Sequence, residues 1–198
     1  MRQLFARDRV RFLILLTGLA FATAAWAENP VTDSSPEVVE LKDIYVRFKV
    51  RVFGLARIMG RFDRLRGELT SATDGEGATV RMHIDVDSVN TDDAWRDNYL
   101  RGPTFFKVEH YPHITFSGSC LSDGENGSGR IVGDLSLHGT TKRVVFQVQA
   151  VGVPGSGSAG GYQATATIRR SDFGMNTLQH IVSDKVEIIV AMNTDAGK

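Results

Sequence analysis

Apolar and polar residues alternate with a period of two along most of the chain beyond residue 38, and no other feature constrains the fold as strongly. The clearest example is the segment 44–53, in which Val46, Phe48 and Val50 are separated by charged residues. Such alternation is typical of a β-strand with one face in a core and the other in water. The pattern predicts eight strands, at residues 44–53, 62–70, 80–86, 113–121, 131–137, 144–150, 161–170 and 186–192.

One internal segment breaks this rhythm and is predicted to form a short helix over residues 94–101. Thr91 is a candidate N-cap, and the acidic residues that follow it favour the positive end of a helix dipole. Gly102 and Pro103 then act as a stop signal. Phe105 and Phe106 give this helix an apolar flank that could serve as a lid or as a fixed plug.

Turn-forming residues separate the predicted strands, among them a Gly/Ser-rich run at residues 154–161 that we expect to join two strands of one sheet. The fold class predicted for residues 38–198 is therefore all-β, with eight antiparallel strands and one short helix. An up-and-down β-barrel satisfies this pattern best because closure removes the sheet edges, and a two-sheet sandwich is the alternative. The single cysteine, Cys120, excludes an intrachain disulfide and follows the inward phase of its strand.

The first 27 residues have the pattern of a secretory signal peptide. A segment rich in arginine is followed by an uncharged apolar run over residues 12–22, and Ala25 and Ala27 frame a cleavage site. We expect cleavage after Ala27, a flexible lead-in over residues 28–37, and export to the bacterial periplasm. An uncleaved membrane anchor is the weaker alternative, since the uncharged stretch is shorter than a bilayer-spanning helix requires.

The charge and the motifs argue against several classes of function. The net charge is zero, so no global positive field favours nucleic acid. His110 and His113 flank a proline and no neighbouring cluster completes a ligand set, so no metal site is expected. Asp85 and Asp87 are interpreted as a solvated surface pair rather than as a general acid and base. Without a nucleophile elbow or a phosphate-binding loop, the sequence indicates a protein that is not an enzyme.

Several ordered motifs resemble those of one protein family. These are Ser88-Val89-Asn90-Thr91, Arg96-Asp97-Asn98-Tyr99-Leu100-Arg101, Tyr111-Pro112-His113-Ile114-Thr115-Phe116, Gly133-Asp134-Leu135-Ser136-Leu137-His138-Gly139 and Arg170-Ser171-Asp172-Phe173-Gly174. Together they resemble the signature of the YceI family, and several motifs in order are far more specific than one. In two places the chain departs from the family pattern, since Val52 and Tyr99 stand where histidine is usual.

The resemblance implies a lipocalin-like periplasmic barrel that holds a polyisoprenoid lipid, such as an isoprenoid quinone or a polyprenyl carrier, in its apolar interior. It implies no catalytic residue and no required cofactor. The protein would act as a carrier or a sequestering protein. A transient contact with the membrane surface and a homodimer are compatible with the sequence. The alternative is a non-enzymatic interaction module whose barrel is filled by its own side chains, because periodicity tells which face points inward and not how much space remains there.

The candidate ligand-binding residues are the inward and aromatic side chains of the predicted barrel. They are Val46, Phe48, Val50, Val52, Met82, Ile84, Trp95, Phe105, Phe106, Phe116, Leu135, Phe146 and Phe173. Three residues of the predicted helix form a polar group at the mouth of the barrel or pin the helix to the sheet: Arg96, Asp97 and Tyr99.

Overall fold

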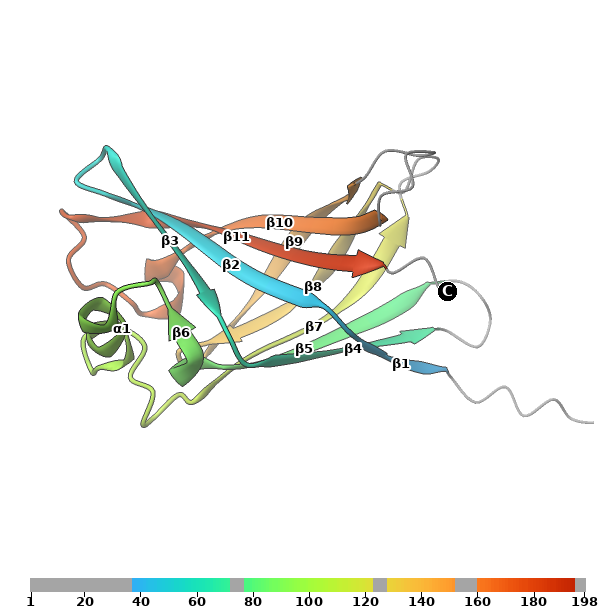
Figure 1. Ribbon diagram of the computed structural model, residues 1–198, viewed down its shortest axis with the longest axis horizontal. Coiled ribbons are helices and arrows are strands. Elements are labelled where there is room, and N and C mark those ends of the chain that lie inside the picture. The colour runs from blue at the N-terminus through green and yellow to red at the C-terminus, as the bar shows by residue number, and fades with distance from the viewer. Residues whose placement is uncertain (1–36, 72–76, 123–127, 152–159, 195–198) are drawn as a thin grey trace, which may run out of the picture. The chain divides into compact units, whose positions relative to one another are not determined.

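The computed structural model describes residues 37–71, 77–122, 128–151 and 160–194, and within these ranges eleven strands form one antiparallel sheet (Figure 1). The strands are β1 (Val38–Leu41), β2 (Ile44–Val52), β3 (Ala56–Phe62), β4 (Leu65–Ser71), β5 (Ala78–Asp85), β6 (Val89–Asn90), β7 (His113–Ser122), β8 (Gly129–Leu137), β9 (Thr140–Val151), β10 (Gly160–Arg169) and β11 (Val182–Thr194). One α-helix, α1 (Ala94–Arg101), and two short 3₁₀ helices, η1 (Val86–Ser88) and η2 (Arg170–Phe173), accompany them. The all-β class with one short helix is confirmed.

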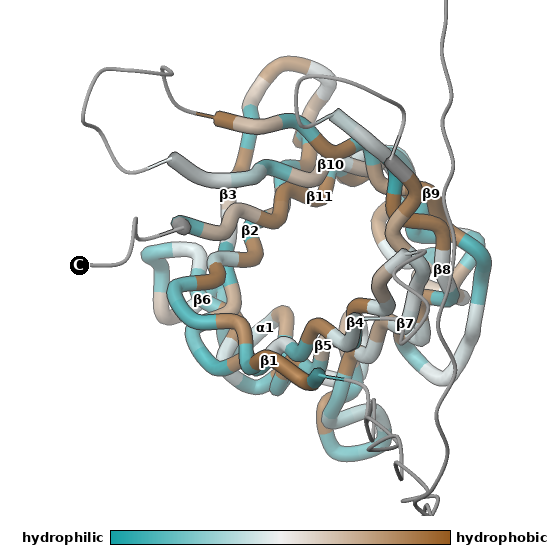
Figure 2. Tube along the Cα trace, turned by 90° about the vertical axis from the view of Figure 1, so that its right-hand side faces the viewer, coloured by the Kyte–Doolittle hydropathy of each residue, from teal (hydrophilic) through white to brown (hydrophobic). Residues whose placement is uncertain are grey.

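The sheet curls round on itself, because strands that follow each other along the chain stand near opposite ends of its strand order. The order is β1-β4-β5-β7-β8-β9-β10-β11-β2-β3-β6. Short connections join β1 to β2, β3 to β4 and β5 to β6, and each of them links one end of this order to the other. Figure 2, which views the sheet from the right-hand end of Figure 1, shows the strands arranged in a ring. The sheet is thus brought round on itself by its connections, with β1 and β6 as the edges of the hydrogen-bonded order.

The predicted count of eight strands is wrong, although each predicted strand is present. The additional strands are β1, β3 and β6. Asp43 has a positive φ of 53°, and this kink separates β1 from β2. In β3 the alternation is hidden, because the inward position is occupied by Gly60 while the apolar Met59 is 58% exposed. β6 has two residues, too few for any periodicity to appear.

The predicted direction of the side chains is confirmed where strand pattern and burial can be compared. In β5, Val80, Met82 and Ile84 are buried, and the residues between them are exposed or half-buried. The Gly/Ser-rich run was expected to join two strands of one sheet, and β9 and β10, which precede and follow it, do pair antiparallel. Residues 152–159 themselves lie outside the described ranges.

Helix α1 begins at the predicted residue but with a different cap. Asp93, not Thr91, is the N-cap, and its carboxylate accepts hydrogen bonds from the backbone N–H groups of Trp95 and Arg96, both at 3.1 Å. A capping side chain accepts a hydrogen bond from the second or third N–H group of its helix. Because the helix starts at Ala94, the residue placed to do this is the one directly before it, Asp93. Gly102 ends the helix as predicted.

The predicted signal peptide and most of the lead-in fall on residues 1–36, outside the described ranges. Among the residues that the structure does describe, no helix has the length and hydropathy needed to span a membrane.

Candidate functional site

An apolar cavity of about 590 Å³ lies inside the curled sheet. Its walls come from ten strands, β1, β2, β3, β4, β5, β7, β8, β9, β10 and β11, together with side chains of α1 and of the segment that follows it. Such a volume is in the range of small-molecule and cofactor sites. The interior is therefore hollow, which decides against the filled barrel that the sequence had left open.

Most of the predicted lining residues do face this cavity. They are Val46, Phe48, Val50, Met82, Ile84, Phe105, Phe106, Phe116, Leu135 and Phe146. Three others are placed elsewhere. Val52 is the last residue of β2 and is not part of the wall, Trp95 is 76% exposed on the outer side of α1, and Phe173 is 1% exposed within the packed core. These three assignments to the lining are wrong, because neighbouring structure and not residue type decides what a side chain faces.

Glycines at inward positions help to keep the cavity open. A Cβ atom at Gly60 would lie 2.2 Å from Cζ of Phe48, so the ring of Phe48 occupies the space that a side chain on β3 would need. The ring of Phe116 has the same relation to Gly118 and Gly133, where a Cβ would lie 2.8 Å from Cζ in each case. Large aromatic rings are thus accommodated against the wall, and the space along the middle of the sheet is left free.

The segment after α1 closes one end of the cavity. Phe105 and Phe106 of this segment line the cavity together with Leu100 of α1, and Phe106 makes an edge-to-face contact with Phe62 at a centroid distance of 6.0 Å. Backbone hydrogen bonds hold this segment, from Phe106 N–H to Leu100 O at 2.9 Å and from Val108 N–H to Arg101 O at 3.1 Å. These contacts favour the fixed plug over the lid.

Arg96 and Asp97 pin the helix rather than form a polar mouth. Asp97 is buried, and its Oδ1 accepts hydrogen bonds from the N–H of Thr91 at 2.8 Å and from its Oγ1 at 2.6 Å. Arg96 donates from Nε to Oγ1 of Thr91 at 2.8 Å and from Nη2 to its carbonyl at 2.7 Å. Tyr99 is instead an aromatic contact, stacked on Trp95 and edge-on to Phe105.

Arg170 is a buried cation at the closed end of the cavity, and the sequence analysis named it only as part of a family motif and not as a site residue. Its guanidinium donates to the carbonyl groups of Met175, Thr177, Val182 and Ser183 at 3.0–3.2 Å. Burial lowers the pKa of Arg170, although an arginine stays charged in proteins. The sequence did indicate that Arg170 is buried, because position 170 continues the two-residue spacing of the inward residues Ala164, Ala166 and Ile168.

Two further groups, Asp184 and Cys120, have a shifted pKa. Asp184 has a lowered pKa, chiefly because its carboxylate accepts a hydrogen bond from the N–H of Ser171 at 2.9 Å. Cys120 lines the cavity, and burial raises the pKa of its thiol. A raised pKa keeps the thiol protonated, which agrees with a structural role for this cysteine.

The structure brings together three potential metal ligands that the sequence analysis did not group. His113 lies beside His83 and Asp85, and one possible ligand atom from each of the three is within 4.8 Å of the others. The sequence analysis missed this group because it compared His113 with residues nearby along the chain, whereas Asp85 is its cross-strand partner in β5.

Comparison with known proteins agrees with this fold. Residues 38–194 match the YceI-like domain. The chain is 30% identical to protein YceI of Escherichia coli over 183 residues, which are 89% of this chain and 95% of that protein.

Solved structures show a similar fold. The structure of Burkholderia cenocepacia BcnA has a TM-score of 0.66 at 21% identity and covers 76% of this chain and 96% of that one. A polyisoprenoid binding domain from Saccharophagus degradans, implicated in plant cell wall breakdown, has a TM-score of 0.60 at 19% identity and covers 81% of this chain and all (100%) of that one. At these identities the likeness concerns the fold, a lipocalin-like curled sheet. On the domain match and the E. coli relative together, this chain belongs to the YceI family.

Proposed function

We propose that this protein holds the chain of a polyisoprenoid lipid, such as an isoprenoid quinone or a polyprenyl carrier, in its cavity and acts as a non-enzymatic carrier or sequestering protein. The observation on which the proposal rests is the apolar cavity of about 590 Å³. The family and the polyisoprenoid binding domain of S. degradans support the same class of ligand.

Burial of hydrocarbon is sufficient to drive such binding. An isoprene unit has about five carbons, and burial contributes roughly 0.8 kcal/mol per carbon, so each unit gains about 3–4 kcal/mol before the loss of chain entropy is subtracted. Several units in the cavity would outweigh the cost of ordering the chain. No charged group is needed along the wall for this interaction.

The orientation of the lipid follows from the two ends of the cavity. At the closed end, the N–H groups of Arg170 are directed at four backbone carbonyls, which leaves this cation poorly placed to receive a polar head group. At the other end the lining contains exposed side chains, among them Leu121 and Tyr162, at 46% and 41% exposure. We infer that the prenyl tail enters from that end and that the head group stays near it.

Export to the periplasm belongs to this proposal and is supported by the pattern of residues 1–27. There the protein would collect or deliver its lipid by transient contact with a membrane surface. The mass of the protein recovered from the periplasm tests the predicted cleavage after Ala27.

Organic extraction of the purified protein, followed by mass spectrometry and by titration of the delipidated protein with an isoprenoid quinone, tests the binding. The proposal expects a co-purifying prenyl lipid or saturable binding of the added quinone. A protein that is free of lipid after purification and also fails to bind the quinone would overturn it.

A further inference from the structure

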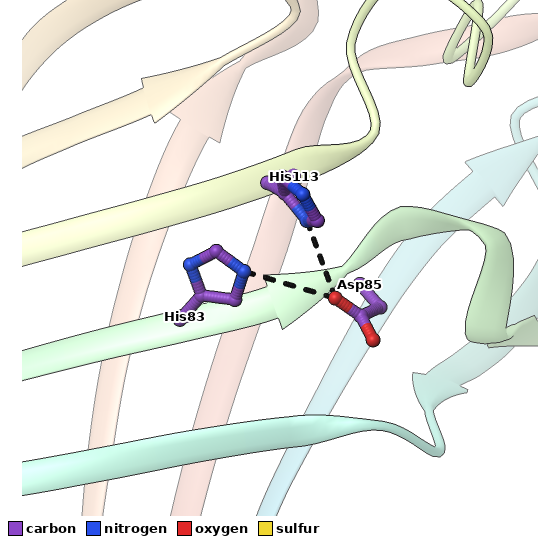
Figure 3. Close-up of side chains that lie close together, drawn as sticks. All are labelled: His83, Asp85 and His113. Atoms are coloured by element: carbon purple, nitrogen blue, oxygen red, sulfur yellow. Dashed lines mark ion pairs between the residues drawn. The ribbon is translucent and has the colours of Figure 1, made fainter.

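Three potential metal ligands meet on the outer face of β5 and β7, away from the lipid cavity (Figure 3). Oδ1 of Asp85 lies 3.2 Å from Nδ1 of His113 and 3.7 Å from Nε2 of His83. The centroids of the two imidazole rings are 4.4 Å apart. In Figure 3 both rings are turned toward the same carboxylate oxygen.

The strand ladder produces this arrangement. His83 and Asp85 are two residues apart on β5 and so point to the same face, and Asp85 is the cross-strand partner of His113 on β7. The alternate residues of the same strands, Ile84 and Ile114, point inward and line the cavity. The three ligands are therefore held by two paired strands of the sheet and not by loops.

The charges around the cluster orient the carboxylate without closing the site. Nε of Arg64 lies 3.5 Å from Oδ2 of Asp85, so Oδ1 is left facing the histidines. Arg64 is also paired with Asp87. A second cation, Arg66, acts on His83 through its charge. The two arginines and the two aspartates balance, so a divalent cation meets no large net positive charge here.

The histidines are suitable ligands in their neutral form. A neutral imidazole offers a lone pair on one nitrogen, which is the form that binds a metal. The side chains of His83 and His113 are 26% and 49% exposed, so a metal ion from solution can reach both.

We propose that His83, Asp85 and His113 form a binding site for Zn²⁺ or a similar divalent transition-metal ion. The ligand atoms would be Nε2 of His83, Oδ1 of Asp85 and Nδ1 of His113. The fourth position of a tetrahedral zinc ion would be taken by water, as in zinc sites with three protein ligands. Two imidazoles and one carboxylate do not suit Mg²⁺ or Ca²⁺, which prefer six or more oxygen ligands.

Isothermal titration with ZnCl₂ tests the proposal on the protein purified without a histidine tag. We expect one saturable Zn²⁺ site per chain and no comparable heat with MgCl₂. His83→Ala, His113→Ala and Asp85→Asn should each weaken Zn²⁺ binding about tenfold or more, since even the loss of an outer-shell partner weakens a site by about 10- to 100-fold. Visible absorption of the Co²⁺-loaded protein gives a second readout, in which bands of tetrahedral Co²⁺ should be lost with the same substitutions.

His110→Ala and His180→Ala are the matched controls, because both histidines are exposed and lie outside the cluster. They should bind Zn²⁺ as the parent does, and circular dichroism checks that every variant is folded. An equal loss in the control variants would assign the zinc to scattered surface histidines and overturn the proposal. So would a parent protein that binds no Zn²⁺, or that binds Mg²⁺ equally well.

Discussion

Replacing Ala164 with Trp should obstruct the cavity while leaving the sheet intact. Ala164 is on β10, is 9% exposed and faces the cavity between its ladder partners Val148 and Val190, which also line it. An indole ring there would take the room of at least one isoprene unit. With one unit displaced, prenyl binding should weaken by about 3–4 kcal/mol, or roughly 100- to 1000-fold in Kd.

The assay is titration of the delipidated protein with an isoprenoid quinone, and thermal unfolding is measured alongside. Overpacking of a filled core destabilises by about 1–3 kcal/mol, but the cavity gives the ring space, so unfolding should change little. Thr167→Trp on the same strand is the control, because Thr167 is exposed and points outward. If the Ala164 variant is folded and binds the quinone as tightly as the parent or the control, the ligand does not occupy this cavity and the reasoning is refuted.

Three further predictions concern stability, each measured as the free energy of unfolding in urea. Asp97→Ala removes the buried acceptor of the N–H and Oγ1 of Thr91 and should cost about 1–3 kcal/mol; a loss below about 0.5 kcal/mol would contradict the pinning role. Burial lowers the pKa of His138 below its ordinary value of about 6.5. Because the unfolded chain then takes up the proton more readily, the contribution of His138 is fully present above that pH and is lost as the pH falls through the folded pKa. In His138→Asn the difference between pH 5 and pH 8 should be smaller than in the parent, and an unchanged difference would rule His138 out as its source. In Gly133→Ala the new methyl carbon would start 2.3 Å from the carbonyl oxygen of Ser117, a backbone atom that cannot move aside alone. This variant should lose about 1–3 kcal/mol, and wild-type stability would show that β7 and β8 adapt more easily than the structure indicates.

Substitutions at Phe146 and Gln147 test which side chains of β9 point into the cavity. Phe146→Asp should weaken prenyl binding more than Gln147→Asp, because Phe146 lines the cavity and Gln147 is exposed on the other face of β9. Equal effects at Phe146 and Gln147 in folded variants would contradict the assigned faces.

Alternation along the chain was sufficient to predict eight of the eleven strands in the described residues and the direction of most of their side chains. Phe48, Met82 and Phe116 could be assigned to the interior because successive side chains of a strand point to opposite faces, whatever the rest of the protein does. The ends of α1 could also be predicted from the neighbouring residues alone, since its first and last residues agree with the prediction. The motifs around Arg96, Tyr111, Gly133 and Arg170 were sufficient for the family.

Features that depend on strands from distant parts of the sequence could not be obtained in this way. Periodicity does not tell that Gly60 leaves room for the ring of Phe48, that Trp95 faces solvent, or that Phe173 packs into the core instead of the wall. The His83, Asp85 and His113 cluster exists only because β5 and β7 pair in one register, which brings residues about 30 positions apart into contact. The sequence alone thus determined which side chains point inward, whereas the tertiary structure decided that space remains between them, because that space depends on the distance and register of strands that meet only after the sheet has curled.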